Sequence, residues 1–249
     1  MQGITTKAVY WEKSDFIEKK LITSTISNEN PLLGGAKEPD KIIKRLSPQG
    51  LAKVAAKSKI AIKNLSIELS GEPLYLYDAT DVLLQNCVVT SKSVLTCIKV
   101  DSSKNVQILN CTIANGALGV SILWGPVDLT IKNSIFYNNG TAIMIWDNPL
   151  TADMMGRPEA GTEKLSRQPR EDVKLTLFYN DFWNKRDCYN CQKGEHDITK
   201  DPQFLDPKKP DFHLSGSSPC IDAGDPDQKY NDPDGSRNDM GAFPAGKKK

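Results

Sequence analysis

Short runs in which apolar and polar residues alternate recur through the middle of the chain. Apolar pairs spaced two residues apart occur at Ile60/Ile62, Val82/Leu84, Val106/Ile108 and Leu129/Ile131. A period of two places successive apolar side chains on the same face of a β-strand. The sequence therefore predicts a series of short strands, each with one buried face.

An asparagine follows these runs and recurs at a nearly constant interval. The recurring residues are Asn64, Asn86, Asn110, Asn133 and Asn180, with successive gaps of 22, 24, 23 and 47 residues. A fixed period of about 20 to 50 residues indicates stacked units that bury their apolar faces against each other. Asparagine tolerates left-handed backbone angles at tight bends. We therefore expect each asparagine at a corner, with its amide bonded to the amide of the next coil.

Two further strand-like runs complete each repeat. The second run has its predicted inward positions at Leu65/Ile67, Cys87/Val89, Cys111/Ile113 and Ser134/Phe136. The third run has them at Leu74/Leu76, Ile98/Val100, Val120/Ile122 and Ile143/Ile145. Three short strands in one such period form the unit of a parallel β-helix, and the period predicts about six to seven coils.

The repeat resembles the right-handed parallel β-helix proteins, the pectin-lyase-like superfamily in the broad sense, over about residues 54–220. The segment 201–227, "DPQFLDPKKPDFHLSGSSPCIDAGDPD", resembles the closing segment of many bacterial secreted β-helix proteins. This resemblance implies an all-β, right-handed single-stranded parallel β-helix and an extracellular or cell-surface location. Proteins with this fold differ widely in function, so the fold alone does not indicate an activity.

Three segments fall outside the repeat. Residues 1–53 fit it poorly and are predicted to cap the N-terminal end, with a short helix within 46–59 covering the open coil. Residues 147–172 combine prolines, glycines and mixed charges without a period, so we expect a long inserted loop in the 54–220 solenoid. Residues 221–249 form an acidic closing segment and tail.

Composition excludes some classes of partner. The formal net charge is +1, which gives no reason to expect nucleic acid as a partner. No apolar run approaches the roughly 20 residues that cross a bilayer, so no membrane insertion is expected. The first residues lack the pattern of a signal peptide. We therefore expect either a cytosolic protein or a mature or recombinant form of an exported one.

The outward side of the third strands carries the candidate site. Its predicted outward residues are Tyr75/Tyr77, Lys99/Asp101, Ser121/Leu123 and Met144/Trp146, with Trp124 at the edge. Aromatic rings on a flat sheet suit the apolar faces of sugars. The candidate ligand-binding residues are Tyr75, Tyr77, Lys99, Asp101, Trp124 and Trp146. The alternative is that the long loop covers these side chains as a secondary apolar cluster.

Three classes of function stay open at this stage. The leading hypothesis is a secreted or cell-surface protein that binds a partner, a polysaccharide or a neighbouring protein subunit, through this face and the loop. A second is a polysaccharide lyase or glycoside hydrolase, with Lys99 and Asp101 as candidate catalytic residues, although such a pair is more often a surface ion pair. A third is a structural subunit of an extracellular assembly. His213 is expected to be structural.

Metal sites are suggested by two clusters. The tail concentrates carboxylates at Asp225, Asp227, Asp232, Asp234 and Asp239, which predicts a structural Ca²⁺ site, the alternative being an acidic turn-rich loop. Cys188 and Cys191 match half of a zinc site that His196 and Cys220 would complete. Zinc is not favoured there, and a local disulfide or free thiols are preferred.

Cys87 and Cys111 share one inward column, where stacked buried thiols are preferred over a bridge. Asn139, in "NGT", is the one credible glycosylation acceptor.

Overall fold

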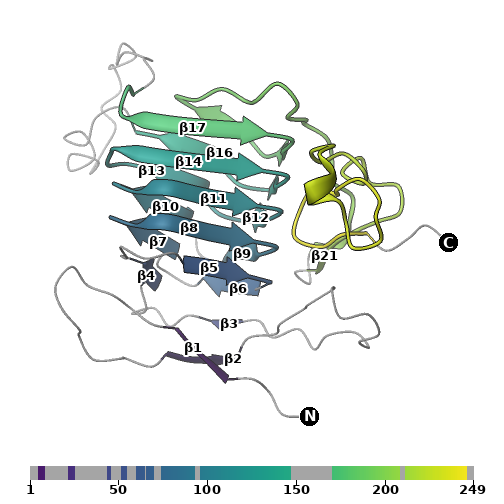
Figure 1. Ribbon diagram of the computed structural model, residues 1–249, viewed down its shortest axis with the longest axis horizontal. Coiled ribbons are helices and arrows are strands. Elements are labelled where there is room, and N and C mark those ends of the chain that lie inside the picture. The colour runs from purple at the N-terminus through teal and green to yellow at the C-terminus, as the bar shows by residue number, and fades with distance from the viewer. Residues whose placement is uncertain are drawn as a thin grey trace.

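The protein is a parallel β-solenoid in which strands of successive coils stack to form three parallel sheets (Figure 1). The computed structural model describes residues 5–8, 22–25, 44–45, 52–54, 60–64, 66–69, 74–92, 96–146, 170–207 and 211–245. Within these ranges the regular elements are strands and one 3₁₀-helix, η1 (Gln228–Tyr230), with no α-helix. The predicted all-β class and parallel solenoid are therefore confirmed.

The chain visits the three sheets in the same order in each coil. The first sheet contains β5 (Ile60–Lys63), β8 (Thr80–Gln85), β11 (Lys104–Leu109), β14 (Val127–Lys132) and β17 (Val173–Phe178). The second contains β3 (Lys44–Arg45), β6 (Ser66–Leu69), β9 (Val88–Ser91), β12 (Thr112–Ala114), β15 (Ile135–Tyr137) and β18 (Asp181–Trp183). The third contains β4 (Ala52–Val54), β7 (Leu74–Tyr77), β10 (Thr96–Asp101), β13 (Leu118–Ile122), β16 (Thr141–Ile145) and β19 (Cys188–Tyr189). The described strands thus form six levels in two of the sheets, at the low end of the predicted coil number.

Two antiparallel pairs accompany the solenoid. Strands β1 (Thr5–Ala8) and β2 (Ile22–Thr25) pair with each other, as do β20 (Phe204–Asp206) and β21 (Asp211–Leu214). Parallel pairing begins at β3, before residue 54, and its last strand is β19, well before residue 220. The helix predicted within 46–59 is wrong at Ala52–Val54, which pair with Leu74–Leu76 as a further coil. A segment with alternating residues can pair its backbone N–H and C=O groups with those of the open sheet edge. A helix in the same place would leave that edge unpaired.

The core is formed by the inward side chains that the alternation predicts. In the first sheet Leu84, Ile108 and Ile131 stand in register and have no exposed surface. In the second sheet Phe136 and Phe182 stack, with ring centroids 5.0 Å apart and planes 4° from parallel. The predicted inward residues of the third sheet are buried as well. Each coil therefore buries its apolar side chains against the coils above and below.

The corner positions of the asparagines are confirmed for the first four. Asn64, Asn86, Asn110 and Asn133 have φ between 49° and 54°, in the left-handed region. The predicted amide ladder joins the first pair, since the Asn86 Nδ2 donates to Asn64 Oδ1 over 3.0 Å. A second ladder, which the sequence analysis missed, joins Asn138 to Asn115 over 2.9 Å at another corner.

The fifth asparagine does not occupy the corner, so the prediction for Asn180 is wrong. The strand register aligns Lys132 with Phe178, which places Tyr179, with φ 54°, opposite Asn133. Asn180 is one residue further, turned inward and without exposed surface. Its Nδ2 donates to the Ile131 carbonyl over 3.0 Å, so the buried amide satisfies backbone groups of the preceding coil.

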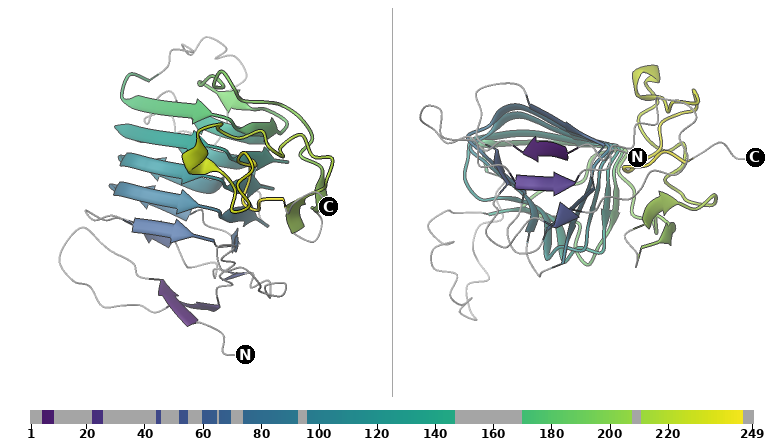
Figure 2. Two further views of the ribbon diagram at one scale, coloured as in Figure 1. Left: turned by 45° about the vertical axis from the view of Figure 1, so that its right-hand side comes forward. Right: turned by 90° about the horizontal axis from the view of Figure 1, so that it is seen from below.

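The C-terminal segment explains why the ladder does not continue. Asn110 Nδ2 donates to Asn238 Oδ1 over 2.9 Å, and Asn133 Oδ1 accepts from the Asp225 amide over 2.8 Å. The segment runs along the corner and the outer side of the second sheet (Figure 2). There the apolar residues Val88, Ala114, Ile135, Phe212, Leu214, Met240 and Ala242 are buried. The closing segment therefore covers the second sheet rather than the third.

Candidate ligand-binding face

The outer face of the third sheet brings the predicted aromatic and charged residues together. Strand register places Tyr75 opposite Lys99, and Lys99 opposite Ser121. Tyr77 stands opposite Asp101, and the rings of Tyr75 and Tyr77 lie 5.7 Å apart. The row continues through Met144 to Tyr189 in the following coils. The spacing of the repeat predicted these neighbours as far as Met144, whereas Tyr189 was not among the predicted outward residues.

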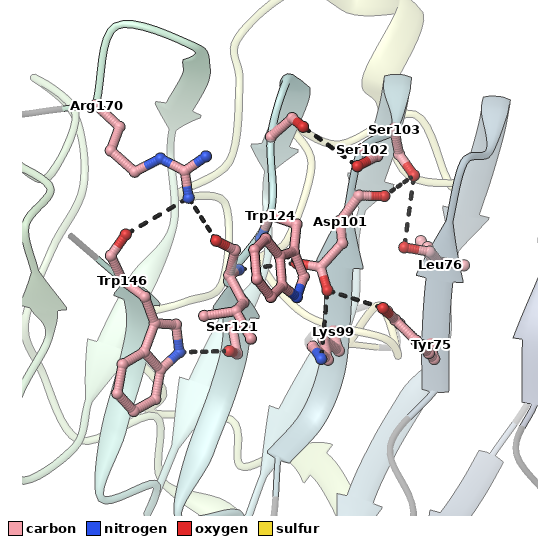
Figure 3. A network of polar contacts seen from close by, with 12 residues as sticks. Tyr75, Leu76, Lys99, Asp101, Ser102, Ser103, Ser121, Trp124, Trp146 and Arg170 are labelled. Carbon is pink, nitrogen blue, oxygen red and sulfur yellow. Dashed lines mark hydrogen bonds and ion pairs between the residues drawn. The ribbon is translucent and has the colours of Figure 1, made fainter. Parts of the chain in front are cut away.

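Asp101 departs from its predicted exposed position, because it has no exposed surface. Its Oδ1 accepts the amide protons of Leu123 and Trp124 over 2.8 and 2.9 Å. Its Oδ2 accepts the Tyr75 hydroxyl over 3.0 Å and pairs with Lys99 Nζ at 3.3 Å (Figure 3). The chain that leaves β13 folds over the carboxylate, because those two amides need an acceptor. Asp101 is therefore a buried hub, and its partner Lys99 stays partly exposed, so the pair differs from the simple surface ion pair considered from sequence.

Tyr75 is held in its protonated form. Its partial burial, followed by the charge of Asp101 and the hydrogen bond to that carboxylate, raises the pKa of Tyr75 well above its usual range. Lys99 Nζ also lies 4.6 Å from the centre of the Tyr75 ring, a cation–π contact. A phenol with a raised pKa is a poor proton acceptor at neutral pH, so this group suits hydrogen bonding better than general-base chemistry.

The two predicted tryptophans flank this hub. Trp124 keeps 39% of its surface exposed. Trp146 is half-buried and donates from Nε1 to Ser121 Oγ over 3.1 Å. Of the predicted loop 147–172, residues 147–169 lie outside the described residues, so the suggestion that the loop covers the aromatic side chains is not tested there.

Arg170 is a structural member of the site that sequence reasoning missed. Its Nη1 donates to the Leu123 carbonyl over 2.6 Å and to the Trp146 carbonyl over 3.5 Å, so one guanidinium joins two neighbouring coils (Figure 3). Asp172 accepts from Nε and Nη2, and this hydrogen bonding lowers the pKa of Asp172. No local sequence signal marks Arg170, since its partners are backbone atoms of distant residues.

The predicted zinc ligands do not converge. His196 stacks on Tyr179 with centroids 4.6 Å apart, and Cys220 donates to buried Asp181 over 3.3 Å. Throughout the described ranges, no group of three or more His, Cys, Asp or Glu side chains is arranged to hold a metal ion. His213 stacks on Phe243 and contacts Asp211 through Nδ1, a packing role.

The predicted calcium ligands are engaged within the tail. Asp225 pairs with Lys132 at 2.7 Å, Asp227 pairs with Lys229, and Asp234 accepts from Ser236. Asp232 and Asp239 are buried, and each accepts backbone amide protons of the same segment. Calcium binding by this cluster stays a prediction.

Asn139 is not a credible glycosylation acceptor, contrary to the sequence interpretation. It is 1% exposed, and its Nδ2 donates to the Ile113 carbonyl over 2.9 Å. Its Oδ1 accepts the Gly116 amide proton over 3.0 Å. The turn that looked exposed in the sequence directs this amide into the corner of the solenoid.

Comparison with known families agrees with the architecture. Residues 39–151 match a family model described as a right-handed β-helix region. Together with the three parallel sheets, this match identifies a right-handed parallel β-helix, consistent with the pectin-lyase-like superfamily in the broad sense. Neither the curated proteins nor the solved structures gave a match. No helix within the described ranges is long and apolar enough to span a membrane.

Proposed function

We propose that this protein binds a polysaccharide on the outer face of the third sheet, with sugar rings packed against its aromatic side chains. The observation that carries this proposal is a set of partly exposed rings, Tyr75, Tyr77 and Trp124, grouped around one buried carboxylate. An extracellular or cell-surface location, which the closing segment's resemblance implies, is part of the proposal.

The support for binding lies in the rigidity of this face. Asp101 fixes the Tyr75 hydroxyl, the Lys99 ammonium and the turn that carries Trp124 through four contacts. Arg170 also holds this turn, through a hydrogen bond to the Leu123 carbonyl. Groups that are already ordered lose little conformational entropy when a ligand binds, which favours affinity. Flat sugar rings can then stack while nearby hydroxyl and ammonium groups bond their hydroxyls.

The charges of the site favour contacts that do not depend on a charged ligand. Lys99 is paired with Asp101, and Arg170 is paired with Asp172. Because each of these cations already has a carboxylate partner, stacking and hydrogen bonding would supply most of the affinity. We expect binding to a polysaccharide to change little as ionic strength rises, since salt screens interactions between exposed charges but not stacking or neutral hydrogen bonds.

Trp124→Ala, with Trp183→Ala as a matched control, tests the proposal. Trp183 is 42% exposed, close to the 39% of Trp124, but it lies at the end of β18 in the second sheet. In titrations against a panel of neutral and acidic polysaccharides, Trp124→Ala should weaken binding about tenfold, the roughly 1.4 kcal/mol of one aromatic stacking contact. Trp183→Ala should bind like the wild type. Binding to no member of the panel, or equal losses in both variants, would overturn the proposal.

The enzyme hypothesis is tested in the same samples. Asp101 has no exposed surface and its two oxygens already take four contacts, so the Lys99/Asp101 pair is poorly placed to reach a substrate. The raised pKa of Tyr75 makes Tyr75 itself a poor general base. We expect no unsaturated ends and no new reducing ends after long incubation with each polysaccharide. Release of either product would favour a lyase or a hydrolase on this face instead.

Assembly is the second candidate function, and exposed aromatic residues on the last coil favour it. Phe178 at the end of β17 is 38% exposed, and Trp183 lies in the neighbouring sheet of the same coil. A subunit of a larger structure would use such a surface to contact another chain. Light scattering at micromolar concentration would then show association that Trp183→Ala weakens and Trp124→Ala does not. A monomer at all concentrations would exclude self-assembly through this coil.

A further inference from the structure

Two cysteines meet at a bend in the last coil. Cys188 lies in β19 and stands opposite Ile143 of β16. Asn190 follows with φ 55°, and its Nδ2 donates to the Ile145 carbonyl over 2.9 Å. The chain turns back there, so that Cys191 Sγ lies 3.8 Å from the Ile143 carbonyl oxygen. Both cysteines therefore contact or pair with the same residue of the preceding coil.

The left-handed residue is what brings the two thiols together. In a continuous strand, residues three apart point to opposite faces. The bend at Asn190 cancels this alternation, and both side chains pack against the edge of the solenoid core. The contact between the thiols, with burial, raises the pKa of Cys191 well above its usual range.

We propose that Cys188 and Cys191 form a reversible intramolecular disulfide that closes the last coil. The oxidant is a disulfide of a small thiol or of another protein. One cysteine, as its thiolate, attacks that disulfide, forms a mixed disulfide and releases one thiol of the oxidant. The second cysteine, also deprotonated, then displaces the other thiol. Two cysteine thiols are thereby oxidised, and one disulfide is reduced to two thiols that carry the two electrons and protons.

Accessibility selects this pair among the cysteines. Cys188 and Cys191 are partly exposed, whereas Cys87, Cys97, Cys111 and Cys220 are buried. Cys87 and Cys111 lie in neighbouring coils in the same inward column, so they are the main competing pair. A dissolved disulfide cannot reach those two in the folded protein, because neither has exposed surface.

The bridge would also affect the outer face of the third sheet. Tyr189 lies between Cys188 and Cys191 in the sequence, and it continues the outward row of the third sheet beyond Met144. A disulfide would restrict the backbone of β19, a two-residue edge strand. The oxidised form is expected to hold Tyr189 in place at the end of the sheet.

The test uses the folded full-length chain in buffers with graded ratios of oxidised to reduced glutathione. After quenching and unfolding, alkylation counts the free thiols and peptide mapping locates any bridge. We expect the count to fall from six to four, with a Cys188–Cys191 bridge that a reductant reverses. Retention of six thiols, a bridge between Cys87 and Cys111, or a lasting glutathione adduct in the wild type would overturn the proposal.

Two variants sharpen the result. In Cys188→Ser the remaining Cys191 has no partner, so it should retain glutathione, and Cys191→Ser should show the converse on Cys188. Circular dichroism before oxidation shows whether each variant is folded. If both variants fail to fold, mapping of the wild-type protein still decides the question. If a folded single variant still loses two thiols to a bridge, that bridge joins other cysteines than Cys188 and Cys191, and the proposal is wrong.

Discussion

Asp101→Ala should destabilise the solenoid and disorder its outer face together. The substitution removes the acceptor of two backbone amides, those of Leu123 and Trp124, and of two side chains. The Tyr75 hydroxyl and the Lys99 ammonium are partly exposed, so water can replace their lost partner. The Leu123 and Trp124 amides both point at a carboxylate that has no exposed surface, and each buried donor left without an acceptor costs about 1 to 3 kcal/mol.

The expected loss in the free energy of unfolding is therefore about 3 kcal/mol, roughly the cost of leaving two backbone amides without an acceptor. Asp101→Asn offers a graded comparison. An asparagine can keep its carbonyl oxygen toward the Leu123 and Trp124 amides, while its NH₂ group faces the Tyr75 hydroxyl and Lys99. We expect it to lose only about 1 to 2 kcal/mol, mainly the charged contacts.

Urea unfolding followed by circular dichroism measures both losses from the shift in midpoint at constant slope. Polysaccharide titration of the folded fraction should show a larger loss for Asp101→Ala than for Asp101→Asn, because only the alanine releases the turn that carries Trp124. Equal stabilities of the two variants, or a loss below about 1 kcal/mol in Asp101→Ala, would refute the assignment of this carboxylate as the hub.

Three further predictions concern other parts of the chain. Asp232→Asn should make stability above pH 7 higher than in the wild type, as urea midpoints across pH would show, and an unchanged pH profile would contradict this. Asn139→Ala should lower the free energy of unfolding by about 2 to 3 kcal/mol, because it removes buried hydrogen bonds to Gly116 and Ile113 of the preceding coil; a neutral effect would be inconsistent with its burial. Gly241→Ala should cost about 1 to 3 kcal/mol in thermal unfolding, since φ is +99° and a Cβ would lie 2.8 Å from Ile135 Cδ1. Gly216→Ala, in open space, is its control and should be neutral.

The sign of the Asp232 effect follows from its environment. Burial, followed by the negative charge of Asp239, raises the pKa of Asp232 from 3.8 to about 7. Below about pH 4 both folded and unfolded chains hold this proton, and the stability it contributes is fully present. Between pH 4 and 7 the unfolded chain releases the proton first, so stability falls, by up to about 4 kcal/mol for three pKa units. Above pH 7 the loss levels off, and an asparagine avoids it altogether.

Most of the architecture could be predicted from local pattern. Alternation at Val82/Leu84 and its equivalents predicted which side chains are inward, because a strand with one buried face requires that period. The recurring asparagines predicted corners, because few residues adopt positive φ at low cost. The same periodicity predicted which outward residues of the third sheet are neighbours, including Tyr75 and Lys99.

The predictions that failed depended on contacts distant in sequence. Asn180 resembles the other asparagines, but the register of β17 after the long insertion placed Tyr179 at the corner. Asp101 alternates like an exposed residue, but the turn after β13 covers it. Ala52–Val54 lies in a helix-like segment, but an open sheet edge was available to pair with it.

The sequence by itself determined that the chain winds into a solenoid, since period and alternation are properties of local stretches and each coil repeats the same local requirement. Tertiary structure alone decided which polar groups are buried and hydrogen-bonded within the protein and which are exposed where a ligand could contact them. It turned Asp101 into a buried acceptor, placed Arg170 across two coils and laid the C-terminal segment over the second sheet. The physical reason is that burial and hydrogen-bond partners depend on atoms brought together from residues far apart in the chain.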